Sequence, residues 1–280
     1  MDAAPNEGEH TRWHGRLSLG FAARDGRTVL ASRRHQGPLC VQRPFYPEGP
    51  GLCHVYVLHP PGGLVGGDNL HLDLAVDAGA RALVTTPSAT KLYRSAGVEA
   101  TIDQTFAVAD GGSLEWLPQE TIVHDGALAR QETVVALRGQ AAFAGWEICC
   151  LGLSAAQETF ASGFFGQGMR LTREGRPVLF DRCHFHGGSA MLDAPWGLGG
   201  NRVSGLFLAT LPRTTALNTD RLDALSAEGP AAFGLCDDLL VGRYVGQDAW
   251  EAKRLFGAAW ALWREHGVGL PPCPPRIWNT

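Results

Sequence analysis

Several features that mark common protein classes are missing from this sequence. It has no run of about 18 uncharged apolar residues, so no membrane-spanning helix is expected. The first ten residues, MDAAPNEGEH, have neither a basic start nor an apolar centre, unlike a signal peptide. The 24 Lys and Arg residues are scattered and outnumbered by 28 Asp and Glu, which does not predict a nucleic-acid-binding surface. We therefore expect a cytoplasmic protein.

The signatures of most enzyme and metal sites are also missing. The seven cysteines are odd in number and include no CxxC pair, which argues against a disulfide framework and a structural zinc site. No GxSxG nucleophile elbow, HExxH motif or facial-triad spacing occurs. The glycine-rich stretch at residues 59–68, HPPGGLVGGD, resembles a phosphate-binding loop, but no Lys-Ser/Thr pair follows it. We expect no catalytic residues and no permanently bound cofactor.

The sequence does contain a long series of short β-strands. Residues 70–76 alternate apolar and polar side chains with a period of two, and residues 52–59 are rich in β-branched and aromatic types. Similar stretches, including residues 100–108, recur to about residue 210 between Gly- and Pro-rich turns. The pattern predicts a layered, mainly β protein with one domain over residues 1–280, of which 1–12 form a disordered tail.

Helical patterns are confined to the C-terminal part. Residues 220–229 and 230–241 are short helical candidates. A longer helix is predicted to begin after the N-cap Asp248 and to end near His266, with Gly267 as its stop. Its broad apolar face consists of Ala252, Leu255, Phe256, Ala259, Trp260, Leu262 and Trp263. The proline-rich segment that follows is expected to be extended and docked, not helical.

Polar side chains gather among apolar ones at several places in the β-rich part. Such groups either satisfy turns and surface pairs or are held inside at an energetic cost, and the second case often marks function. For Asp68, bonds to local backbone amides are the simpler interpretation. The residues concerned are Asp68, Thr85, Thr86, Ser88, Glu115, Glu120, Asp125 and Glu147.

Two further groups of residues have alternative interpretations. His184 and His186 would share one face of a strand and are weak candidates for holding a metal transiently, although a solvated pair is the simpler interpretation. Glu120, His124 and Asp125 could form the acid–base set of a hydrolase, but no nucleophile accompanies them.

In their order along the chain, these motifs resemble the UreD (UreH) family of urease accessory proteins. One departure is Leu153, which stands where the family typically has an arginine after Leu-Gly. The resemblance covers most of the chain, and its segments are residues 37–39 (GPL), 42–49 (QRPFYPEG), 59–68, 85–93, 114–122, 145–147 (GWE), Gly163 and 275–278 (PRIW).

The resemblance implies a β body with strands wound in two layers and a few C-terminal helices. It implies a non-enzymatic accessory protein that forms a complex with UreF and the GTPase UreG on urease apoprotein and assists insertion of Ni²⁺. The eight polar residues above would then line a route for transient Ni²⁺, and a purely structural adaptor is the alternative. Candidate partner-interface residues are Trp260, Trp263, Arg276, Ile277 and Trp278.

Overall fold

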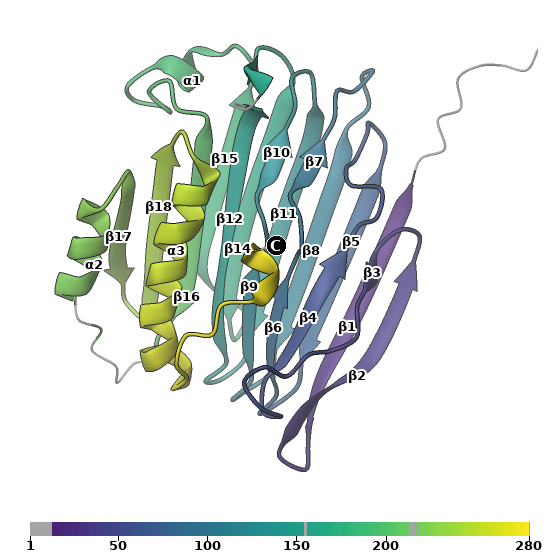
Figure 1. Ribbon diagram of the computed structural model, residues 1–280, viewed down its shortest axis with the longest axis vertical. Helices are drawn as coiled ribbons and strands as arrows, with labels where there is room; N and C mark the ends of the chain where they lie inside the picture. The colour runs from purple at the N-terminus through teal and green to yellow at the C-terminus, as the bar shows by residue number, and fades with distance from the viewer. Residues whose placement is uncertain (1–12, 154–155, 213–216, 218, 280) are drawn as a thin grey trace, which may run out of the picture.

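Two β-sheets stacked face to face form the body of the protein, as the computed structural model shows (Figure 1). The structure describes residues 13–153, 156–212, 217 and 219–279, so the tail expected at residues 1–12 lies outside it. Strands account for 51% of the structure and helices for 14%, which confirms the mainly β class. No helix of the described residues is long and apolar enough to cross a membrane.

The first sheet has seven strands. These are β1 (His14–Arg24), β2 (Arg27–Gln36), β5 (Asn69–Val76), β8 (Ala100–Val108), β11 (Leu128–Leu137), β14 (Phe164–Arg173) and β15 (Arg176–His186). Their spatial order is β15-β14-β11-β8-β5-β1-β2, and β1, β5, β8, β11 and β14 run parallel.

The second sheet has eleven strands. These are β3 (Cys40–Val41), β4 (Cys53–Leu58), β6 (Arg81–Thr85), β7 (Thr90–Leu92), β9 (Ser113–Leu117), β10 (Thr121–Val123), β12 (Ala142–Leu153), β13 (Glu158–Thr159), β16 (Val203–Thr210), β17 (Ala231–Cys236) and β18 (Leu239–Gly246). The main order is β17-β18-β16-β12-β9-β6-β4-β3, and β7, β10 and β13 attach to it through β12.

From β4 to β14 the chain passes repeatedly from one sheet to the other, in a β-solenoid-like arrangement. Parallel neighbours need a crossover, and here the strand of the other sheet supplies it instead of a helix. Three turns of four residues carry the chain from the first sheet to the second, at 77–80, 109–112 and 138–141. In each, the backbone N–H of the fourth residue donates a hydrogen bond to the carbonyl oxygen of the first. Gly79 and Gly111 have φ values of 69° and 67°, which other residues rarely adopt. The predicted two-layered wound body is confirmed.

The core has two parts. Alternating apolar residues of both sheets fill the space between them, whereas the outer face of the eleven-stranded sheet is covered by α3 (Ala249–Trp263) and α2 (Thr219–Ala227) (Figure 1). All seven residues of the predicted apolar face of α3 are buried. A short helix, α1 (Ala190–Asp193), lies between β15 and β16.

Two predictions for the C-terminal part are wrong. Residues 230–241 form β17 and the start of β18 rather than a helix, because they make a hairpin in which Asp237 takes the left-handed conformation. The proline-rich end includes a 3₁₀ turn, Arg276–Asn279.

The limits of α3 are partly as predicted. The Asp248 side chain caps the helix by accepting a hydrogen bond from the Trp250 backbone N–H at 2.8 Å, which confirms the predicted start. At the other end, the chain does not stop at Gly267 but continues through a π-helical turn, Arg264–Val268. Gly269, with φ of 66°, ends that turn.

Candidate functional site

A break in the eleven-stranded sheet opens a cavity between the two layers. β6 ends at Thr85 and β7 begins at Thr90, while β9 ends at Leu117 and β10 begins at Thr121. Pro87 and Pro118 fall in these gaps and cannot donate to a ladder. Across the break, the Gln119 backbone N–H donates to Thr86 Oγ1 at 2.8 Å.

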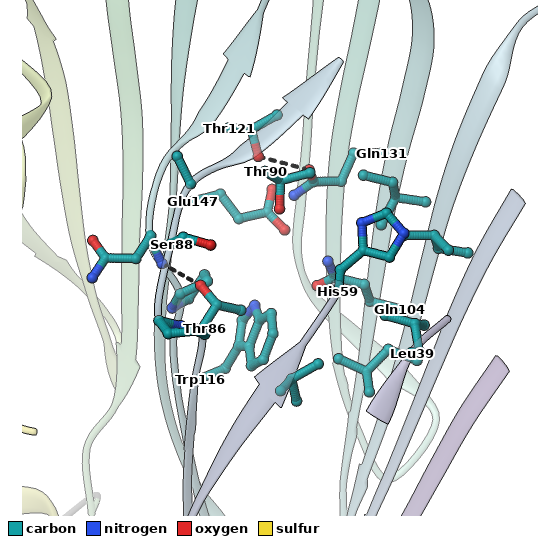
Figure 2. Close-up of a pocket in the computed structure, with 18 of the residues that line it drawn as sticks. Leu39, His59, Thr86, Ser88, Thr90, Gln104, Trp116, Thr121, Gln131 and Glu147 are labelled. Atoms are coloured by element: carbon teal, nitrogen blue, oxygen red, sulfur yellow. Dashed lines mark hydrogen bonds between the residues drawn. The ribbon is translucent and has the colours of Figure 1, made fainter. Parts of the chain in front are cut away.

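The cavity has a volume of about 80 Å³, several times what one buried water needs. Residues from the break line one side, and β5, β8 and β11 supply the facing side. Figure 2 shows Glu147 and Thr121 directed across the cavity towards Gln131. Ser88 is exposed and lies at the mouth of the cavity.

Buried and half-buried polar side chains extend from the cavity along the inner faces of the two sheets. On the seven-stranded sheet, Gln104 pairs with Thr133 across β8 and β11, and Gln131 pairs with Gln167 across β11 and β14. The Thr121 hydroxyl donates to Gln131 Oε1 at 3.3 Å, which joins the two layers. We call this set the polar belt, and its members are Gln104, Thr121, Gln131, Thr133, Glu147 and Gln167.

Glu147, on β12, is the charged residue of the polar belt, and its side chain is 3% exposed. The Thr133 hydroxyl donates to Oε1 at 2.5 Å, and the Gln167 amide donates to Oε2 at 2.9 Å. Burial raises the carboxyl pKa to about 7, although these hydrogen bonds act in the opposite direction. Glu147 can therefore exchange a proton for a cation near neutral pH.

His59, the first residue of the glycine-rich stretch, lines the same cavity. Burial lowers the pKa of its imidazole, while the charge of Asp68 opposes that effect. The ring is thus neutral at pH 7, the form that ligates metal ions. Together, the cavity presents one carboxylate, one imidazole and several neutral oxygens, which a borderline divalent ion accepts as ligands.

The structure brings together only three of the eight polar residues selected from the sequence. Thr86, Ser88 and Glu147 line the cavity, and the other five do not. Asp68 accepts hydrogen bonds from the backbone N–H groups of Val65 and Trp13, at 2.9 and 3.0 Å. It therefore holds its own loop against the start of β1, and the backbone bonding expected for it is confirmed.

Thr85 and Glu115 lie on the side of the sheet that α3 covers. The Thr85 hydroxyl donates to the Leu117 carbonyl oxygen and accepts from Trp278 Nε1 at 3.1 Å. Glu115 is fully buried and accepts two hydrogen bonds from Arg264, both at 2.9 Å, and one from Trp260 at 2.6 Å.

Glu115 belongs to a larger buried ion cluster. Arg264 also donates to Glu48, at 2.6 and 3.0 Å, and His54 lies 2.8 Å from the same carboxylate. Burial alone would lower the pKa of Arg264, but Glu48 and Glu115 hold it above its ordinary value. Burial alone would raise the pKa of Glu48, but His54 and Arg264 hold it below its ordinary value. The cluster keeps all its charges paired inside the fold.

The acids near the start of β11 are also paired. Asp125 accepts from Arg94 at 2.5 Å and from the Ser162 backbone N–H at 2.8 Å. His124 lies 2.8 Å from Glu158. The hydrolase set is thus divided, because His124 and Asp125 each bind another partner.

Glu120 and Leu153 lie near these groups without lining the cavity. Glu120 is half-buried, and its charge adds to burial in raising the pKa of the Cys150 thiol to about 12. Leu153, in place of the usual arginine, ends β12 opposite Glu158.

His184 and His186 do share one face of a strand. Both are exposed on β15, and both rings contact Phe164, at centroid distances of 5.6 and 4.9 Å. Within the ranges that the structure describes, no three His, Cys, Asp or Glu side chains converge as metal ligands.

Of the five candidate interface residues, two are buried, two are half-buried and one is exposed. Trp260 and Trp263 are 1% and 0% exposed, so they pack α3 onto the sheet. Trp278 is half-buried and contacts the rings of Trp146 and Trp260. Arg276 is exposed and Ile277 is half-buried. Large exposed aromatics lie elsewhere, at Trp196 (76%) and Trp250 (66%).

Sequence reasoning missed the polar belt residues of the seven-stranded sheet. Gln131 and Thr133 fall in the same period-two register as Ala129, Val135 and Leu137, which are buried. A polar residue in an otherwise apolar register was the available signal. The same signal marks Gln104 between Ile102 and Phe106.

Comparisons with known proteins agree with the family resemblance of the sequence motifs. A family model described as UreD urease accessory protein matches residues 14–279. The urease accessory protein UreD of Azoarcus sp. (strain BH72) is 45% identical over 269 residues, covering 96% of this chain and 94% of that protein. The urease accessory protein UreD of Dechloromonas aromatica (strain RCB) is 42% identical over 278 residues, covering 97% and 96%.

Proposed function

This chain belongs to the UreD urease accessory protein family, and we propose that it conducts Ni²⁺ towards urease apoprotein in the cytoplasm. In this proposal it forms a complex with UreF and the GTPase UreG, and Ni²⁺ is cargo rather than a resident cofactor. Its contribution is a scaffold with an interior path, and it carries out no catalytic step.

The observation that carries the proposal is the buried carboxylate of Glu147 within the polar belt. A divalent ion cannot cross an apolar core without ligands, because removing its water is costly. Here hydroxyl and amide groups surround one carboxylate whose pKa is about 7. Scattered oxygen ligands bind Ni²⁺ less firmly than a closed Cys/His site, which suits passage and release.

A purely structural adaptor remains the competing proposal. It would explain the family membership and the partners, and it would give the polar belt no function. The two proposals differ in one respect: a conduit needs the interior carboxylate for nickel transfer, whereas an adaptor needs only its surfaces.

Reconstitution with UreF, UreG, urease apoprotein, Ni²⁺, bicarbonate and GTP separates them. Glu147→Gln should lower the nickel content and activity of the urease by roughly tenfold or more, as loss of a metal-site group typically does. Co-purification with the partners should be unchanged. Glu132→Gln is the matched control, because Glu132 lies on the outer face of β11, near Arg182.

Full activation with Glu147→Gln in an intact complex would refute the conduit. Loss of co-purification together with activation would favour the adaptor, because the defect would then lie in assembly. Activation should be unaffected in the Glu132→Gln complex under either proposal.

A further inference from the structure

One ion pair joins the two sheets at a lateral edge of the sandwich. β15 is the last strand of the seven-stranded sheet, and β18 lies next to the last strand of the other. Arg243 on β18 donates to Asp181 on β15. The side chain of Asp181 is 17% exposed and that of Arg243 is 47% exposed, so solvent reaches the pair from outside.

The polar belt ends one strand away from this pair on the seven-stranded sheet and two strands away on the other. On the seven-stranded sheet, Gln167 pairs with Cys183, two residues beyond Asp181 on the same face of β15. On the other sheet, Glu147 and Arg243 both pair with Leu206, so they share its inward face.

The charges at this edge also affect the pKa values of groups between the sheets. The Asp181 carboxylate contributes to the raised pKa of Glu147. Burial and Asp181 raise the pKa of the Cys183 thiol, while Arg243 opposes them. The pair therefore lies within electrostatic range of the belt.

We propose that the Asp181–Arg243 ion pair is a gate that closes the edge end of the polar belt. This inference rests on the proposed conduit and adds its regulation. A guanidinium held between β18 and β15 repels a divalent cation, and its bond to Asp181 links the two sheets. When a cation engages the Asp181 carboxylate, Arg243 is released to solvent, where half of its side chain already lies. Partly exposed ion pairs are weak, so the gate opens at small cost.

Thiol reactivity tests the gate without nickel. Cys149 lies on β12 two residues after Glu147 and is 0% exposed, whereas Cys236 is exposed. Methyl methanethiosulfonate, a small uncharged thiol reagent, is added to the full chain, and modification of each cysteine is followed by peptide mass spectrometry. Arg243→Gln should raise the Cys149 rate by roughly tenfold, as expected when a locally open state becomes more populated. The Cys236 rate should stay constant.

Asp181→Asn should act in the same way, because it releases Arg243 from the other side. Arg254→Gln is the matched control: Arg254 pairs with Glu228 at 2.8 Å and has a 39% exposed side chain, but it lies on α3. A Cys149 rate that is unchanged in both gate variants would overturn the gate. A rate that rises equally in Arg254→Gln would also overturn it, because general loosening would then be the cause.

The gate and the conduit can fail separately. The thiol assay contains no metal. An unchanged Cys149 rate in the gate variants would therefore not contradict the role of Glu147 in nickel transfer. Conversely, normal activation by Glu147→Gln would refute the conduit, while a raised Cys149 rate would still establish a gate on the interior.

Discussion

Burial and hydrogen bonding act in opposite directions on the pKa of Glu147. A carboxylate in an apolar interior is stable only if hydrogen-bond donors compensate for the lost water. Thr133 and Gln167 provide such donors, yet the pKa remains raised to about 7. The folded chain therefore retains a proton on Glu147 at pH values where the unfolded chain has lost it.

This difference predicts a pH-dependent stability. Between the ordinary pKa of 4.5 and the folded value of about 7, the folded state binds more protons than the unfolded state. The free energy of unfolding should thus fall as pH rises through this window, by up to about 3 kcal/mol. Glu147→Gln cannot ionise, so its stability relative to the wild type should increase over the same window. Urea unfolding of both proteins from about pH 5 to about pH 8 measures the difference; parallel curves would contradict it.

Single residues show what sequence can and cannot predict about the site. Glu147, Thr86 and Ser88 were predictable because polar residues stood among apolar ones or at a strand end. Glu115 had the same appearance, but its partner Arg264 lies 149 residues away and is brought to it only by folding. Local pattern cannot distinguish a carboxylate that faces a cavity from one that is neutralised by a distant cation.

At the scale of elements, the turn after α3 fastens the C-terminal part to the sheet. Its first residue, Arg264, reaches Glu115 on β9 and Glu48 in the loop before β4, and it also donates to the Pro271 carbonyl at 2.6 Å. Its guanidinium lies 4.8 Å from the centre of the Trp260 ring. One side chain therefore connects a helix, a strand and the extended tail.

Removing one member of this cluster should be strongly destabilising. Glu115→Gln leaves Arg264 with less compensation in a site that is 0% exposed, so the free energy of unfolding should fall by about 3 kcal/mol. Hydrogen exchange should also accelerate over residues 264–278. Glu120→Gln, five residues along and half-buried, is the control and should change stability by less than about 1 kcal/mol. Equal stability of the wild type and Glu115→Gln in urea would contradict the role of the cluster.

Elements were predictable where the pattern was periodic. Residues 70–76, where apolar and polar side chains alternate, fall within β5 (Asn69–Val76). The start of α3 followed from its cap, but its π-helical end depends on the long-range bonds of Arg264. The β17–β18 hairpin was missed because short apolar runs fit a helix or a strand equally well. The parallel pairing could not be read from the pattern, since it arises only when the chain has wound between the layers.

For the whole molecule, the winding places residues from distant segments around one cavity. From β5 to β14, each passage adds one strand to the seven-stranded sheet and two to the other, so polar residues in register on neighbouring strands lie side by side. The break in the eleven-stranded sheet gives the belt a mouth, and the Asp181–Arg243 pair lies at its far end. Ser88 is exposed at that mouth, so a larger side chain there can obstruct the cavity without disturbing the core.

A large side chain at the mouth should block passage and leave the fold intact. Ser88→Trp places an indole over the cavity entrance, so urease activation by the reconstituted complex should fall by roughly tenfold, as displaced positioning groups can cause. The free energy of unfolding should change by less than about 0.5 kcal/mol, because Ser88 is a surface position. Thr105→Trp is the matched control, since Thr105 is exposed on the outer face of β8 and a strand accommodates tryptophan there. If both variants activate urease as the wild type does, Ni²⁺ does not enter the interior through this mouth.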